Sequence, residues 1–176
     1  QVHEFCQSLI QQIDTMSAIA SAFSQFAAMP TGQSERINVV TTVQRALELY
    51  KDAPITFNST EKSIFANLDA NQLLRIVNNL VSNAIQAIEQ VSDPKINVAI
   101  SIVRNDVVLT VKDNGIGVSE TDRAQIFEPT FTTKTSGMGL GLSMVKSIVG
   151  SFAGSVHFES KPGVETCFEV RFPRIN

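Results

Sequence analysis

The first 29 residues carry apolar side chains at alternating intervals of four and three residues. These positions are Val2, Cys6, Leu9, Ile13, Met16, Ala20, Phe23 and Ala27. This spacing is typical of the buried seam of a helix in a bundle or coiled coil. One helix cannot bury such a face alone, so we expect residues 1–29 to pack on another helix or a second subunit. Pro30 and Gly32 are expected to end the helix, and residues 30–36 are predicted to form a linker.

From residue 37 to residue 176 the pattern is mixed and predicts one further domain. Alternating apolar positions predict strands near residue 37 and over residues 55–58, 64–68, 95–103, 107–112, 156–160 and 166–172. Helical spacing predicts helices after residue 39, from 69 to about 90, from 119 to about 127 and over about 140–149.

Three local signals set the ends of these elements. Asp69 with Gln72 is predicted to form a capping box, Asn105-Asp106 a hairpin turn, and Pro162-Gly163 a second one. The expected fold class is α+β: a two-layer α/β sandwich whose mixed, mostly antiparallel sheet has helices on one face, preceded by one long bundle helix.

Charge and cysteine content exclude several classes of function. The net charge of −3 offers no basic surface for nucleic acid. Cys6 and Cys167 lie far apart and form no C-x-x-C pair, so we expect reduced thiols rather than a disulfide framework or a metal site. No apolar run reaches membrane-spanning length and no signal-peptide pattern occurs. We therefore expect a soluble, cytoplasmic piece without direct membrane contact, whether or not its parent protein is anchored.

Two asparagines interrupt an otherwise apolar predicted helix at residues 79–84 (NLVSNA). Asn79 and Asn83 are four residues apart, so both amides project from one side of the helix. Amide oxygens can hold Mg²⁺ directly or through its waters, usually together with substrate phosphates. The alternative is that both side chains only cap nearby backbone groups.

A carboxylate and two glycines follow a predicted strand at residues 113–117 (DNGIG). Asp113 at a strand end can accept hydrogen bonds from an amino group such as that of adenine. Gly115 and Gly117 let the backbone turn sharply and approach a ligand closely. The same letters also occur in ordinary turns.

Two more segments complete the candidate chemistry. Residues 126–134 (IFEPTFTTK) have little to bury after Pro129, which suits a mobile lid carrying Lys134 near a phosphate chain, or else an ordinary surface loop. Residues 137–142 (GMGLGL) run into a helix, whose first backbone N–H groups form an anion site. The spacing matches neither the dinucleotide G-x-G-x-x-G motif nor a P-loop.

The order of these four segments resembles the N, G1, F and G2 boxes of histidine kinases. Those kinases belong to an ATPase superfamily that also includes gyrase, MutL and the heat-shock chaperone. The resemblance covers residues 37–174 and implies the Bergerat fold. Residues 12–14 (QID) and 23–30 (FSQFAAMP), like residues 127–134 (FEPTFTTK), are similar to nitrogen-regulation-type kinases. By that likeness, residues 1–29 would be the second helix of the dimerisation bundle.

The resemblance implies ATP and Mg²⁺ as cofactors and assigns roles to individual residues. Asn83 would be the Mg²⁺ ligand with Asn79 beside the phosphates, Asp113 would read the adenine amino group, and Lys134 would reach the phosphates. The full set implied to contact the nucleotide is Asn79, Asn83, Ala87, Asp113, Gly115, Gly117, Phe127, Thr132, Thr133, Lys134, Gly137, Met138, Gly139, Leu140 and Gly141.

The implied activity is transfer of the γ-phosphoryl of Mg-ATP to a histidine on a dimerisation helix absent from this chain. A response-regulator receiver domain would then take the phosphoryl group on an aspartate, and the full-length protein would be a homodimer. His3 lacks the sequence that usually follows the acceptor histidine, and His157 is expected to be structural. Gln86 stands where many relatives have a basic residue.

Two other functions stay open. One is an ATP hydrolase of the same superfamily, although Asn79 stands where those enzymes carry the glutamate that activates water. The other is a nucleotide-binding regulatory module without turnover.

Overall fold

The computed structural model describes residues 33–129 and 139–175, so the helix predicted over residues 1–29 lies outside the described part. The strands are β1 (Glu35–Asn38), β2 (Ile55–Ser59), β3 (Phe65–Leu68), β4 (Ile96–Val103), β5 (Asp106–Asp113), β6 (Ser155–Lys161) and β7 (Glu165–Pro173). The helices are α2 (Val39–Leu47), the 3-10 turn η1 (Glu48–Tyr50), α3 (Ala70–Ala87) and α4 (Gly141–Ser151).

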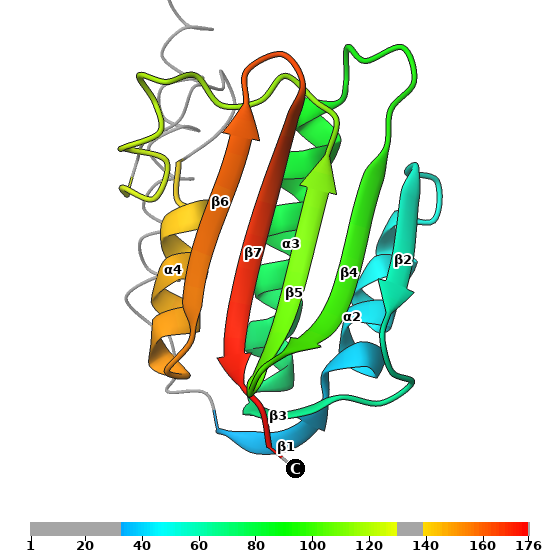
Figure 1. The fold of residues 1–176 in the computed structure, drawn as a ribbon, viewed down its shortest axis with the longest axis vertical. Helices are drawn as coiled ribbons and strands as arrows, with labels where there is room; N and C mark the ends of the chain where they lie inside the picture. Colours follow the sequence, from blue (N-terminus) through cyan, green and yellow to red (C-terminus); the bar gives the residue numbers. More distant parts are fainter. Residues whose placement is uncertain (1–32, 130–138, 176) are drawn as a thin grey trace, which may run out of the picture.

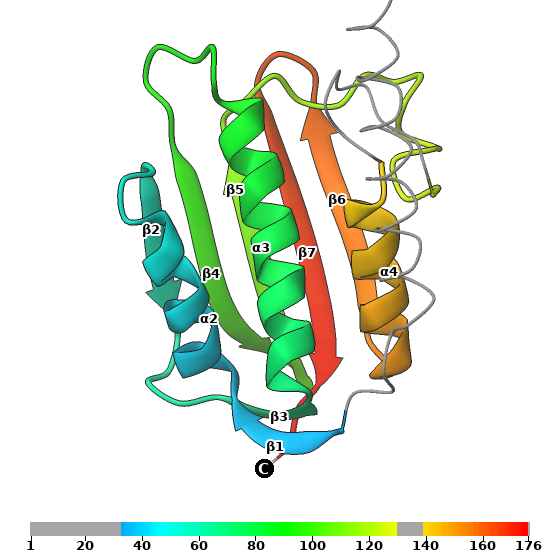
Figure 2. The same cartoon turned by 180° about the vertical axis from the view of Figure 1, so that it is seen from behind.

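The larger sheet has five strands in the order β2-β4-β5-β7-β6. β2 runs parallel to β4, and the other three pairings are antiparallel. A separate two-stranded sheet of β1 and β3 lies below the larger one in Figure 1. α2, α3 and α4 cover one face of the large sheet, as the two opposite views in Figures 1 and 2 show. The expected two-layer α/β sandwich with a mixed, mostly antiparallel sheet is confirmed.

The core lies between the helices and the inward face of the sheet. α3 buries an apolar stripe that includes Leu73, Val77 and Leu80, as its helical spacing predicts. Alternate residues of the central strands meet this stripe, among them Leu109 of β5 and Val170 of β7, which pair directly. The apolar stripe of α3 therefore faces the sheet, where it meets the inward-pointing apolar residues of the strands. The remaining sides of the helix point away from the sheet or toward its edges.

Two local predictions were partly wrong. Asp69 caps α3 by accepting a hydrogen bond from the backbone N–H of Gln72 at 3.0 Å. The buried Gln72 Oε1 has no partner, so the second half of the capping box does not form. The β4–β5 hairpin turns at Arg104-Asn105, one residue earlier than predicted, because Asp106 already pairs with Val103.

The helix predicted over residues 119–127 is also wrong, since this segment is a run of successive turns. The backbone N–H groups of Asp122, Gln125 and Glu128 each donate to the carbonyl three residues earlier. Ser119 Oγ accepts from the N–H of Asp122, so the predicted capping interaction is present at 3.2 Å. The segment has few apolar residues to bury, and no helical stripe holds it against the core.

Among the described residues, no helix is long and apolar enough to cross a membrane. Cys167 on β7 is a free thiol. The carboxyl ends of α3 and β5, the start of α4 and the β6–β7 turn all lie toward the upper end of the molecule in Figure 1. That end carries the residues singled out from the sequence.

Candidate functional site

Asp113 ends β5 and is buried, with 3% of its surface exposed. It pairs across the sheet with Ile96 on one side and Thr166 on the other. Its Oδ1 accepts a hydrogen bond from the backbone N–H of Gly115 at 2.9 Å. A buried carboxylate needs hydrogen-bond donors, and this one is held in a fixed orientation by the backbone that follows it.

The next residues pass directly against the end of α3. A Cβ atom on Gly115 would lie 2.5 Å from the carbonyl oxygen of Ala87 and 2.7 Å from its Cβ, so only glycine fits. The N–H of Ile116 donates to the same carbonyl at 3.1 Å. Glycine was expected at position 115 because the backbone there would come close to another group. That group is the end of α3 at Ala87.

The opposite side of this segment rests on the β6–β7 turn. Gly117 has φ of +69°, and a Cβ there would lie 2.5 Å from the carbonyl oxygen of Lys161. The N–H of Gly163 donates to the carbonyl of Ile116 at 2.7 Å, and that of Val118 donates to Ser160 Oγ at 2.8 Å. Sequence patterns did not indicate this support, because it joins residues more than forty positions apart.

Asn114 anchors the same loop sideways. Its Oδ1 accepts from the N–H of Lys95 at 2.8 Å, and its Nδ2 donates to the carbonyl of Asp93 at 2.8 Å. The side chain between the aspartate and the first glycine thus ties the loop to the start of β4. It is a structural residue that sequence reasoning did not single out.

Asn79 connects α3 to the start of α4. Its Nδ2 donates to the carbonyl of Arg75, one turn earlier, at 2.8 Å. A Cβ on Gly141 would lie 2.6 Å from Asn79 Oδ1, so the amide rests against the glycine backbone. The helical pattern predicted that Asn79 and Asn83 lie on the same side of the helix. The contact of Asn79 with Gly141 shows that this side faces the start of α4.

Three positions spaced by four residues therefore form a row on α3: Asn79, Asn83 and Ala87. Asn79 at one end touches Gly141, and Ala87 at the other end touches Gly115. Residues four apart lie one above the other on a helix, so Asn83 lies between these two contacts. Asn83 is partly exposed. The row joins three of the four segments that the sequence singled out.

The start of α4 presents backbone N–H groups beside this row. Gly139 has φ of +65°, a conformation that favours glycine, and buried Leu140 is the residue before the helix. No side chain of the described residues caps this helix end. The carbonyl of Leu140 accepts from the N–H of Met144 and from Ser143 Oγ, both at 3.0 Å, which holds the first turn in place.

Phe127 lies in an aromatic cluster on the helix side of the sheet. Its ring meets Phe158 and Phe168 edge to face, with centroids 6.0 and 6.4 Å apart. Lys146 Nζ of α4 lies 5.9 Å from the centre of the Phe127 ring. The cluster fixes the residue at which the candidate lid begins. The predicted site residues Thr132, Thr133, Lys134, Gly137 and Met138 lie outside the described residues.

The part of the chain from residue 68 to residue 176 matches the sequence profile of the family described as histidine kinase-, DNA gyrase B-, and HSP90-like ATPase. This match covers more than half of the chain. The chain belongs to this ATPase family. Its fold, with helices on one face of a mixed sheet, is the Bergerat fold expected from the order of the four boxes.

Two curated relatives of the chain are named as kinases. Sporulation kinase A of Bacillus subtilis (strain 168) is 36% identical over 112 residues, which cover 64% of this chain and 18% of the relative. Sensor histidine kinase ZraS of Escherichia coli (strain K12) is 26% identical over 98% of this chain and 38% of its own length. The chain thus spans well under half the length of these two curated relatives, and it contains the ATP-binding catalytic domain found in them.

Solved structures support the fold. The catalytic domain of histidine kinase ThkA superposes with a TM-score of 0.72 at 24% identity, covering 80% of this chain and 95% of that one. Full-length ShkA, crystallised with AMPPNP, superposes with a TM-score of 0.77 at 22% identity, covering 99% of this chain and 39% of that one. At these identities the comparison concerns the fold of the ATPase domain alone.

Proposed function

We propose that this end of the domain binds Mg-ATP, and that the whole protein transfers the γ-phosphoryl group to a histidine. The observation that carries the proposal is the row of Asn79, Asn83 and Ala87 between Gly141 and Gly115. It places an amide pair beside a helix N-terminus at one end and a buried carboxylate at the other. A nucleotide needs a contact of the first kind for its phosphates and one of the second kind for its base.

The adenine end fits the residues present. Asp113 would accept a hydrogen bond from the exocyclic amino group, because its carboxylate is oriented by the N–H of Gly115. Ala87 and Gly115 would form the small-residue wall of the pocket beside Asp113. A larger residue at position 115 would clash with the end of α3 at Ala87. Gly117 would complete the turn around the base. A carboxylate in a buried position interacts more strongly with such a donor than one in water.

The phosphate end fits in a similar way. The N-terminus of α4, which no side chain of the described residues caps, presents N–H groups and the positive end of the helix dipole. Gly139, Leu140 and Gly141 would bring the backbone close to phosphate oxygens. Lys134, with Thr132, Thr133 and Met138, would approach from the candidate lid, and Gly137 would let that lid move.

The donor set also fits magnesium that arrives with the nucleotide. Among the described residues there is no group of three or more His, Cys, Asp or Glu side chains able to hold a metal. Mg²⁺ in phosphoryl-transfer sites commonly takes only one or two protein oxygens, completed by phosphates and water. Asn83 would supply the amide oxygen. When bound, the ion neutralises charge on the phosphates.

The chain's own part in the reaction is positioning. Asp113 would fix the base, the start of α4 would fix the phosphates, and Lys134 would offset the charge that develops on the γ-phosphoryl group. Asn79 cannot act as a general base, and its Nδ2 is engaged with the Arg75 carbonyl. This supports transfer to a protein acceptor rather than hydrolysis.

The acceptor histidine would lie on a dimerisation helix outside this chain, in a homodimer whose second bundle helix is residues 1–29, joined by the linker 30–36. The phosphoryl group would pass to an aspartate of a response-regulator receiver domain. The names of the sensor-kinase relatives support this assignment. We place the domain in the cytoplasm, where such regulators work.

Incubation with γ-labelled ATP and Mg²⁺ tests the proposal. The chain alone should remain unlabelled and release phosphate only slowly, whereas a second polypeptide carrying the parent protein's acceptor helix should become labelled in acid-labile form. Asp113→Ala should abolish that labelling. Rapid phosphate release without an acceptor would indicate a hydrolase instead. Label on the chain itself that disappears in His3→Gln would contradict the placement of the acceptor.

A further inference from the structure

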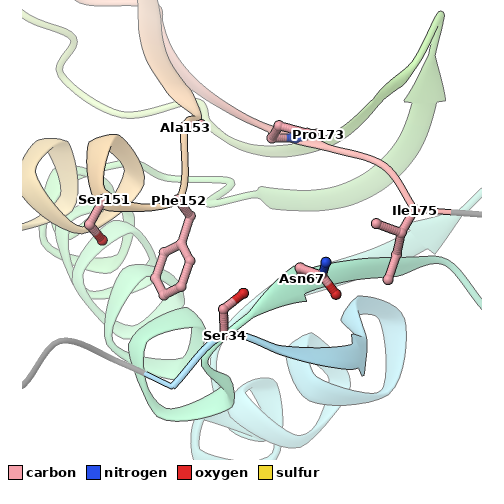
Figure 3. Close-up of a pocket in the computed structure, with 7 residues that line it drawn as sticks. All are labelled: Ser34, Asn67, Ser151, Phe152, Ala153, Pro173 and Ile175. Atoms are coloured by element: carbon pink, nitrogen blue, oxygen red, sulfur yellow. The ribbon is translucent and has the colours of Figure 1, made fainter.

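A cavity of about 340 Å³ (Figure 3) lies beside the start of β1 and the end of α4, at the opposite end of the domain from the carboxyl end of β5 (Figure 1). Its wall is built from the end of α4 at Ser151 and Phe152, from Asn67 of β3, and from Ile175 after β7. Ser34, just before β1, closes the remaining side. We name this hollow the base cavity. Its volume lies at the lower end of the range of ligand pockets, about 300–1,000 Å³.

None of the described residues that line the base cavity carries a charged side chain. Phe152, Ala153, Pro173 and Ile175 form its apolar wall, and the remaining lining residues are two serines and an asparagine. Ala153 has φ of +54°, in the region where glycine is usually found at a helix end. Its methyl group adds to the apolar wall where glycine would add none. Figure 3 shows the Phe152 ring on the α4 side of the cavity, with Ser34 next to it and Asn67 beyond Ser34.

The chain that precedes Ser34 has a matching composition. Residues 15–33 contain no charged side chain, and the last large apolar side chains before the cavity wall are Phe26 and Met29. Met29 is five residues before Ser34, so an extended chain lets it travel at most about 18 Å, and Phe26 at most about 29 Å. Both side chains can therefore reach the cavity from the point where the chain enters its wall.

Neither side chain occupies a seam position of the four–three spacing, which assigns Phe23 and Ala27 to the seam. Phe26 widens the apolar stripe at its edge, and Met29 lies beside it, three residues further along one side of the helix. An apolar pair outside the seam needs another surface to cover it, because exposed apolar area is unfavourable in water. The base cavity is such a surface, and it is the one nearest along the chain.

We propose that the base cavity is the docking site of residues 26–30 of the same chain, with Phe26 and Met29 covering Phe152, Pro173 and Ile175. Docking there ties the ATPase domain to the preceding helix and restricts its orientation. Because the cavity lies at the far end of α4 from Gly141, the nucleotide end stays open while the segment is docked. A second cavity, of about 510 Å³ beside β2, includes Glu61 and Lys62 in its wall and does not match the uncharged segment.

Disulfide trapping in the whole chain tests the contact. In a background of Cys6→Ser and Cys167→Ser, Ala28→Cys is combined with Ser151→Cys in the cavity wall. The control combines Ala28→Cys with Arg36→Cys, an exposed position much closer in sequence. Docking predicts that the 28–151 bond forms at least about tenfold faster than the 28–36 bond, since loop length alone favours the control. Met29→Asp should remove this preference.

Other results would overturn the proposal. Equal or faster trapping of the 28–36 pair would show an undocked segment. A 28–151 disulfide found only at twice the chain mass would mean that a second copy fills the cavity.

Hydrogen exchange gives an independent measurement. Asn67→Trp fills the base cavity from an exposed strand position, and Asn58→Trp places the same side chain on exposed β2 as the matched control. Docking predicts that residues 26–30 exchange about tenfold faster in Asn67→Trp than in the wild-type chain, with no change in Asn58→Trp. If residues 26–30 exchange at the same rate in both variants, docking is refuted. The same result is expected if packing in the helix bundle alone protects these residues.

Discussion

Replacing Gly115 by alanine would place a methyl group 2.5 Å from the carbonyl oxygen of Ala87 and 2.6 Å from its carbonyl carbon. Ordinary contacts of a methyl carbon begin near about 3.4 Å, so the loop or the end of α3 must move by roughly 1 Å. Both contacting atoms belong to backbone, which cannot rotate away as a flexible side chain would. The substitution therefore strains the joint between α3 and the loop after β5.

The expected cost follows from two terms. Overpacking a closely packed site costs about 1–3 kcal/mol, and weakening the hydrogen bond from Ile116 N–H to the Ala87 carbonyl, 3.1 Å long, adds up to about 1 kcal/mol. For a chain of this size 1 kcal/mol lowers the melting temperature by about 2–4 °C. We therefore expect Gly115→Ala to melt at a temperature lower by roughly 2–16 °C. Since Ala87 and Gly115 line the proposed adenine end, ATP affinity should fall at least about tenfold.

Gly150→Ala is the matched control. It lies in α4, and outside the adjoining helix backbone no atom of the described residues comes within 4 Å of the added methyl group. Alanine is favoured over glycine in a helix by up to about 1 kcal/mol, so this variant should melt at the same temperature or slightly higher. Differential scanning calorimetry and ATP titration on both variants measure the effects. A Gly115→Ala protein with wild-type stability and ATP affinity would refute the close contact and the base pocket built on it.

The remaining predictions concern single residues. Asp113→Ala should abolish ATP binding by calorimetry while the far-ultraviolet circular dichroism stays native, and unchanged affinity would disprove its role. Asn83→Ala should weaken ATP binding mainly when Mg²⁺ is present, whereas equal losses with EDTA would indicate a structural asparagine. Burial raises the pKa of the Cys167 thiol, which favours the unreactive protonated form. In a Cys6→Ser background, iodoacetamide at about pH 8 should therefore modify the folded chain much more slowly than the chain in urea, and equal rates would contradict this burial.

Much of the fold was predictable because it depends on local periodicity. The stripe on α3 and the alternation in β4, β5 and β7 each report which side of an element is buried, and the structure agrees. The segment 119–127 failed because a capping pattern without an apolar stripe does not make a helix. The predicted role of Gln72 in the capping box was wrong because its side chain is buried and does not bond back to the backbone at Asp69.

The candidate site was predictable only in part. The pattern showed that Asn79 and Asn83 share a face, and the resemblance to histidine kinases implied what that face does. Nothing in the spacing indicated that Asn79 would rest on Gly141, or Ala87 on Gly115, because these contacts join distant parts of the chain. The support from the β6–β7 turn was missed for the same reason. Long-range pairing depends on the whole topology, which local patterns do not encode.

Titration of the chain with ATP and with GTP, each with Mg²⁺, tests the central claim most directly. The two bases differ where Asp113 would act: adenine offers an amino group to its carboxylate, and guanine presents a carbonyl oxygen at that position. We predict that ATP binds with a dissociation constant between about 1 μM and 1 mM, and that GTP binds at least about tenfold more weakly. Equal affinity for both nucleotides, or no heat of binding with ATP, would contradict the account.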